Sequence, residues 1–125
     1  MDTRFTAITP ILRIFDVNKA REFYLDFLGF TLDFEHRFDD NAPWYLQVRL
    51  DGITLGLSEH FGGGSPGAHF TVATSGLAAY QAALIAKDYR HARPGLVQQP
   101  WGETTMTIAD PFYNHIIFSE PTPPA

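Results

Sequence analysis

The alternation of apolar and polar positions in the first half of the chain predicts a strand followed by a helix. Phe5 to Phe15 forms an apolar strand interrupted at Pro10, where a proline indicates an edge, a bend or a hinge. A helix is expected from Asn18, the candidate N-cap, to Gly29, a typical C-terminal stop. Its apolar stripe has helical spacing and comprises Ala20, Phe23, Tyr24, Phe27 and Leu28. We expect this stripe to pack against a sheet.

Three further strands complete the first half. The first runs from Phe30 to Arg37. Residues 44–50 then alternate in a strand pattern, with Trp44, Leu46, Val48 and Leu50 on one face and Tyr45, Gln47 and Arg49 on the other. Asp51-Gly52 is a typical two-residue hairpin turn, and it leads into a last strand from Ile53 to Glu59.

A glycine-rich segment, Gly62 to Gly67, interrupts the pattern and indicates a linker. The pattern then restarts with a strand, a helix, a less regular segment and two strands. The strand is expected at His69–Ala73. The helix has a candidate N-cap at Ser75 and an apolar stripe of Leu77, Tyr80, Leu84 and Ile85. The irregular segment reaches Pro100, and the two strands follow at about Glu103–Ala109 and His115–Glu120. The Pro-rich tail, residues 121–125, cannot continue a ladder, so we expect it to be frayed.

The two halves therefore share the order β-α-β-β-β, and each closes on a similar tripeptide, Leu57-Ser58-Glu59 and Phe118-Ser119-Glu120. Each half is too small to close a core alone. The expected fold class is α+β, with two βαβββ modules paired into one curved mixed sheet and the helices outside. We expect a single domain over residues 1–125, built of modules 1–64 and 65–120. The sheet face opposite the helices carries small and polar residues, and the repeat favours a shared concave cavity there.

Composition narrows the classes of function. The chain has 125 residues, 45% of them hydrophobic and 18% charged, which fits a folded domain. It has no cysteine, which excludes disulfides, thiolate zinc sites and cysteine nucleophiles. Neither a membrane-spanning run nor a signal-peptide h-region is present, so a cytoplasmic location is expected. The net charge of −5, without a Lys/Arg cluster, argues against nucleic acid and is compatible with a cationic ligand, although mild acidity also serves solubility alone.

Two stretches carry a family resemblance. RIFDVNKAREFYLDFLGFTLDF and QQPWGETTMTIADPFYNHIIFSE resemble the opening and closing modules of the glyoxalase/bleomycin resistance/dioxygenase (vicinal oxygen chelate) superfamily. The matching elements are the apolar strand with Asp-Val, the helix with Phe-Tyr, Leu-Gly-Phe, Pro-Trp-Gly, Asp-Pro, and the Asn before the last strand. The likeness runs from about Thr9 to Glu120. It implies the glyoxalase/bleomycin resistance fold, which hosts many chemistries.

Metal-dependent members of this superfamily place one ligand on the first and last strand of each module. The resemblance carries these positions to Thr9, Gly56, His69 and Ile117. Only His69 is a competent ligand, and one imidazole cannot hold a divalent ion, so neither a metal nor another cofactor is expected. A slip of one or two residues in this alignment could bring in Glu59, His60 or His115, but a one-residue slip would put a side chain on the wrong face of its strand. His69 is otherwise an ordinary strand histidine.

The branch without a metal, the bleomycin resistance proteins, is the most similar. These are homodimers that sequester a cationic glycopeptide drug in grooves, without chemistry. The resemblance implies ligand-binding roles for Asp33, Phe34, Phe38, Ser58, Trp101 and Gly102, and a strand-exchange hinge at Pro10. Phe38 and Trp101 would clasp the flat part of the drug. Composition alone favours the alternative, in which Trp101 is a core plug, that is, a side chain buried in the hydrophobic core. A negative field would come from Asp33, Asp39, Asp40 and Glu59.

The sequence also departs from that branch. His69-Phe70-Thr71 stands where those proteins carry a tryptophan, and Phe112 and Tyr113 replace small residues of the last turn. Bleomycin itself is therefore not fixed as the ligand. The alternative is an enzyme of the same fold, a lyase, isomerase or dioxygenase acting on a small oxygenated substrate. A ligand-binding module without a resistance role is a third option.

Overall fold

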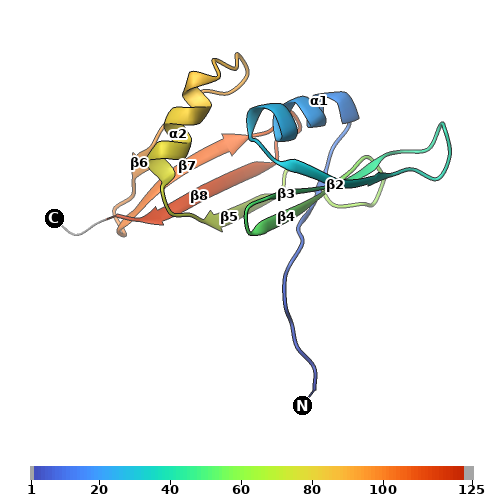
Figure 1. Ribbon diagram of the computed structural model, residues 1–125, viewed down its shortest axis with the longest axis horizontal. Coiled ribbons are helices and arrows are strands. Elements are labelled where there is room, and N and C mark those ends of the chain that lie inside the picture. Colours follow the sequence, from blue (N-terminus) through green and yellow to red (C-terminus); the bar gives the residue numbers. More distant parts are fainter. Residues whose placement is uncertain (1, 123–125) are drawn as a thin grey trace.

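The computed structural model describes residues 2–122 and contains the order β-α-β-β-β twice (Figure 1). The elements are β1 (Ile11–Arg13), α1 (Val17–Arg21) continuing as a π-helical segment η1 (Glu22–Phe27), β2 (Thr31–His36), β3 (Tyr45–Leu50), β4 (Ile53–Ser58), β5 (His69–Ala73), α2 (Leu77–Ala86), β6 (Val97–Gln98), β7 (Glu103–Ala109) and β8 (His115–Pro121). They form two four-stranded sheets, β1-β4-β3-β2 and β5-β8-β7-β6. β1 with β4 and β5 with β8 are parallel and the other pairs antiparallel. The predicted α+β class is confirmed.

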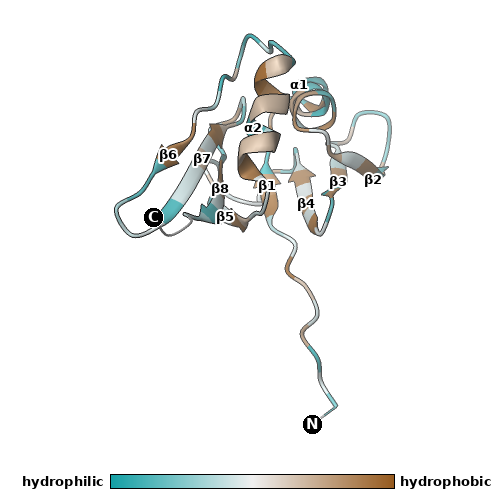
Figure 2. Cartoon of the chain, turned by 60° about the vertical axis from the view of Figure 1, so that its left-hand side comes forward, coloured by the Kyte–Doolittle hydropathy of each residue, from teal (hydrophilic) through white to brown (hydrophobic). Residues whose placement is uncertain are grey.

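Both helices lie on one side of the sheets, and in Figure 2 β1 stands beside β5, where the two sheets meet. The core fills the layer between helices and sheets. Phe23, Tyr24 and Phe27 of the first helix are buried there. The predicted alternation of the third strand is confirmed, because Leu46 and Val48 are fully buried while their neighbours point to the opposite face. No helix in residues 2–122 has the length and apolar character needed to cross a bilayer.

The N-cap of α1 is Asp16, and the prediction of Asn18 was wrong. The extended backbone of Asp16 lets its Oδ1 accept from the backbone N–H groups of Asn18 and Lys19, at 2.9 and 3.1 Å. The prediction failed because Asn18 already lies inside the first turn.

The N-cap of α2 is Gly76, and the prediction of Ser75 was also wrong. Gly76 has a left-handed backbone (φ 73°), which glycine adopts without strain, and it has no side chain to cap the helix. The carboxylate of Glu120 does so instead. Its two oxygens accept from the N–H groups of Gly76 (2.9 Å) and Leu77 (3.2 Å).

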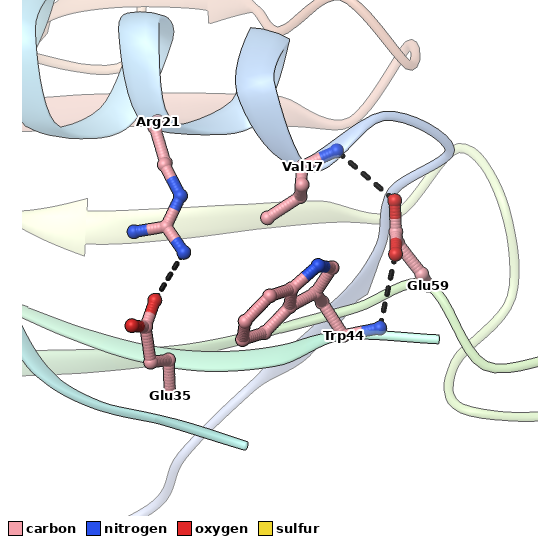
Figure 3. Close-up of polar contacts among 5 residues, drawn as sticks. All are labelled: Val17, Arg21, Glu35, Trp44 and Glu59. Atoms are coloured by element: carbon pink, nitrogen blue, oxygen red, sulfur yellow. Dashed lines mark hydrogen bonds and ion pairs between the residues drawn. The ribbon is translucent and has the colours of Figure 1, made fainter. Parts of the chain in front are cut away.

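Glu59 has the same role in the first module (Figure 3). One of its oxygens accepts from Val17 N at the start of α1 (3.0 Å), and the other from Trp44 N (2.9 Å). Each module therefore sends a carboxylate from the end of its last strand to the N-terminus of its own helix, where negative charge is favourable. This contact explains why both halves close on a glutamate.

The first predicted strand is wrong over residues 5–10. β1 is only Ile11–Arg13, and its last upstream ladder bond joins Gly56 N to Pro10 O at 2.8 Å. The segment before Pro10 leaves the body as an extended arm (Figure 1). Phe5 and Ile8 are 91% and 88% exposed on it. The apolar pattern is that of a strand, but within one chain this arm has no strand to pair with.

The C-terminal end is more ordered than predicted. β8 extends to Pro121, which pairs with Glu103, and Thr122 N then donates to Gly102 O at 2.8 Å. The prediction of fraying was therefore wrong at Pro121, because the next residue supplies the donor that proline lacks. The rest of the predicted tail, 123–125, lies outside the described residues. The segment expected to be irregular contains the short strand β6.

A buried polar cluster joins the modules. The Asp110 carboxylate accepts from the Tyr24 hydroxyl (2.7 Å), from Asn114 Nδ2 (2.8 Å) and from two backbone N–H groups of its own turn. Asn114, fully buried, also donates to Arg13 O (2.9 Å) and accepts from Ala68 N (3.1 Å). Burial, together with the charge of Asp110, raises the pKa of Tyr24 well above its usual value. The Asp-Pro turn thus anchors the second module to the first.

Candidate functional site

The face of the first sheet that points away from the helices carries most of the predicted ligand-binding residues. A register shift between Leu32 and Phe34 turns both Asp33 and Phe34 to this open face. Asp33 Oδ1 contacts Arg49 Nη2 at 2.6 Å, and Oδ2 accepts from Gln47 Nε2 at 3.2 Å. Arg49 therefore neutralises much of the charge that Asp33 was predicted to offer a cation.

Aromatic rings line one end of this open face. The Phe34 ring lies 6.0 Å from that of Tyr45. Phe38 is 79% exposed and meets the edges of His36 and His60, with ring centroids 4.9 and 6.2 Å apart. These rings have the exposure that a stacking ligand requires.

Ser58 and Glu59 are engaged inside the chain. Ser58 is 2% exposed, its hydroxyl accepts from His60 N (3.1 Å), and Gly63 packs so closely over it that no Cβ would fit. Ser58 therefore holds the following loop against the end of β4. Glu59 faces the helix side, where both oxygens are already bonded. Of the predicted acidic groups, Asp39 and Asp40 remain in the exposed loop after β2.

Trp101 and Gly102 belong to the other sheet, in the loop between β6 and β7. Trp101 is 67% exposed and its Nε1 donates to the Glu103 carboxylate at 2.7 Å. A core plug is thereby excluded. The hydrogen bond fixes the edge of the indole and leaves its faces open to a ligand.

One chain does not bring the two groups together. The loop after β2 and the loop between β6 and β7 lie at opposite ends of the molecule in both views (Figures 1 and 2). Phe38 and Trp101 can therefore clasp one ligand only if they come from different copies.

The four positions expected to hold a metal in related enzymes do not form a site. Thr9 lies on the arm, and Gly56 has no side chain. The His69 ring stacks on that of His115, at 4.3 Å between centroids and 26° between planes. Over residues 2–122, no three His, Cys, Asp or Glu side chains gather in a way that could hold a metal ion. These four positions therefore do not supply a ligand set for a divalent metal.

Sequence reasoning missed two residues of the open faces. His115 Nδ1 is buried without a hydrogen-bond partner, and Tyr45 lies across Gly56. The strand period placed both side chains on the correct face. The parallel pairing of β5 with β8, which puts His69 opposite His115, has no local signal in the sequence.

Two βαβββ modules that share a core and present open, partly aromatic sheet faces define a paired-module α+β fold. The chain belongs to the glyoxalase superfamily: the family model described as "Glyoxalase superfamily protein" matches residues 1–123. No curated protein matches the sequence.

Solved structures share this fold at low sequence identity. TnmS3, an antibiotic binding protein from Streptomyces sp. CB03234, has a TM-score of 0.70 at 21% identity, over 96% of this chain and 99% of that one. A bleomycin-binding protein complexed with bleomycin has a TM-score of 0.67 at 18% identity, over 93% and 98%. A glyoxalase-related enzyme from Clostridium phytofermentans has a TM-score of 0.72 at 16% identity, over 96% and 98%. The fold thus includes both binding proteins and an enzyme-related chain.

Proposed function

We propose that this protein is an antibiotic-resistance protein that sequesters a flat, cationic drug of the bleomycin type in grooves between two copies, without chemistry. The observation that carries the proposal is the exposure of Phe38 (79%) and Trp101 (67%), which lie in loops at opposite ends of the molecule. Both rings are exposed enough for a planar ligand to stack on them. The antibiotic-binding and bleomycin-binding chains of the same fold support this reading.

In the proposed groove, Phe34 and Phe38 of one copy face Trp101 and Gly102 of the other. A planar heteroaromatic group stacks between the rings, and its positive charge gains from cation–π attraction. Asp33 contributes shape and hydrogen bonds more than charge, since Arg49 pairs with it. Asp39, Asp40 and the net charge of −5 supply the field that attracts a cation.

The dimer is part of the proposal, and the N-terminal arm supports it. A hollow of about 590 Å³ lies between residues 6–10 of the arm and the facing segments 52–55 and 70–73 of the two sheets. We propose that Pro10 acts as the hinge at which the arm crosses to the second copy and adds a strand there, which would cover Phe5 and Ile8. The proposal includes a cytoplasmic location, which the absence of cysteine supports.

Titration with bleomycin, followed by tryptophan fluorescence and calorimetry, tests the function. We expect micromolar or tighter binding that quenches Trp101. Trp101→Ala should weaken binding about tenfold or more, as expected for the loss of a stacked ring worth about 1.4 kcal/mol. The matched control is Trp44→Phe, which changes the partly buried tryptophan beside Arg21 and Arg37 and should leave affinity unchanged. If the unmodified protein shows no binding heat and no quenching, sequestration of this drug is refuted.

An enzyme of the same fold is the second candidate, and one observation favours it. His69 and His115 stack on the open face of the second sheet, and His115 Nδ1 has no protein partner. Imidazoles in such a position serve as general bases or metal ligands. Retention of about one equivalent of a divalent ion after dialysis, lost in His69→Ala, would favour the enzyme over sequestration.

A further inference from the structure

The Tyr45 phenol lies on the open face of the first sheet, at the start of β3. Tyr45 is on β3, next to β4, and its ring lies diagonally across Gly56. A Cβ at Gly56 would come within 2.5 Å of the Tyr45 hydroxyl oxygen. The phenol therefore fills the space that a side chain at position 56 would occupy.

The polar groups around Tyr45 already have partners. Asp33 uses one oxygen for Arg49 and the other for Gln47. Within residues 2–122 no hydrogen bond engages the Tyr45 hydroxyl, and the residue is half-buried, so solvent satisfies this group. The Asp33 carboxylate already accepts from Arg49 and Gln47, whereas the phenol O–H is a donor still available to a ligand.

Tyr45 is also held in orientation. Phe34 flanks its ring at 6.0 Å between centroids and 33° between planes. A planar ligand that stacks beside Phe34 would cover the hydroxyl and strip its water. The hydroxyl must then donate to the ligand, because otherwise it loses the hydrogen bond it makes to water. Such a site rejects an analogue that lacks the hydrogen-bond acceptor.

We propose that Tyr45 is the specificity-determining residue of the groove, donating a hydrogen bond to a carbonyl oxygen on the planar part of the ligand. The inference rests on the proposed function, because it names a contact within the same groove. Gly56 keeps the phenol in place by leaving room for it.

The test compares three variants in the full-length protein. Tyr45→Phe removes the hydroxyl alone, and Gly56→Ala displaces the phenol while keeping it. Tyr113→Phe is the matched control, since it removes an exposed phenol from the β7–β8 turn. The probes are bleomycin and a fragment pair that differs only in a carboxamide group, whose carbonyl oxygen is the acceptor: isoquinoline-3-carboxamide and isoquinoline. Ring-¹³C tyrosine resonances report contact with Tyr45 directly, and Tyr45→Phe assigns the signal.

We expect Tyr45→Phe and Gly56→Ala to bind bleomycin at least tenfold more weakly than the unmodified protein and Tyr113→Phe. The Tyr45 signal should shift with the carboxamide and not with isoquinoline. Bleomycin binding unchanged in Tyr45→Phe, with Trp101→Ala still weakened, overturns the role of Tyr45 and leaves sequestration standing. If the unmodified protein does not bind bleomycin, sequestration of that drug fails. The fragment pair then decides, because a carboxamide-dependent shift of Tyr45 supports the inference and no shift overturns it.

Discussion

The hydroxyl of Tyr24 is expected to hold the two modules together, and Tyr24→Phe removes that single group. In the native protein it donates to the buried Asp110 carboxylate at 2.7 Å, across the joint between η1 and the β7–β8 turn. Phenylalanine fills the same space, so no cavity opens. The carboxylate keeps its remaining donors, which are Asn114 Nδ2 and two backbone N–H groups.

The magnitude follows from the charge and burial of the acceptor. A hydrogen bond to a charged group contributes about 1.5–3 kcal/mol, and Asp110 at 5% exposure has no water to replace it. We therefore expect Tyr24→Phe to lower the free energy of unfolding by about 2 kcal/mol. The assay is urea denaturation at neutral pH, followed by circular dichroism. A double-mutant cycle with Asp110→Asn isolates the pair from other effects.

The control is Tyr113→Phe, which removes an exposed phenol with no partner in the described part of the chain and should shift stability by less than about 0.5 kcal/mol. A Tyr24→Phe protein as stable as this control, or a cycle with no coupling energy, would show that the cluster does not join the modules energetically.

Three further predictions concern the caps, the pH dependence and the arm. Glu59→Gln and Glu120→Gln should each cost about 1 kcal/mol in urea denaturation and should add in the double variant, because each carboxylate caps a different helix; unchanged midpoints would contradict this. Burial raises the pKa of Tyr80 from 10.0 to about 12. The stability that the neutral Tyr80 phenol contributes is therefore intact below about pH 10 and is lost as pH rises toward 12. Tyr80→Phe should make the melting temperature fall less steeply over this pH range. If the melting temperatures of both proteins fall in parallel, Tyr80 does not titrate in this way. Deleting the residues before Pro10 should convert the proposed dimer to a monomer in sedimentation, whereas an unchanged dimer would remove the arm from the interface.

The fold was largely predictable because its signals are local. Leu46 and Val48 alternate with Tyr45 and Gln47, and a strand with one buried face requires that period. The helix stripe around Phe23 and Phe27 has the spacing of a buried helical face. The element order and the hairpin at Asp51-Gly52 both followed from such patterns.

The helix ends were not predictable from local signals. Glu59 and Glu120 cap helices that begin more than forty residues away along the chain. Local polarity therefore favoured Asn18 and Ser75 as N-caps, whereas the helix N-termini are capped by Asp16, Glu59 and Glu120. Likewise, the apolar arm before Pro10 has the pattern of a strand, but a strand forms only where an edge is available to pair with it.

The candidate site shows the same division. The sequence determined which residue types could stack on a flat cation, and the resemblance left His69 as the one competent ligand among the four metal positions. Only the tertiary structure decided that Trp101 is exposed, that Gly63 covers Ser58, that Arg49 neutralises Asp33 and that Tyr45 fills the space above Gly56. Periodicity places a side chain on a face, because it depends on the backbone of one strand alone. What lies against that face depends on strands and loops distant in sequence, whose pairing the periodicity does not encode.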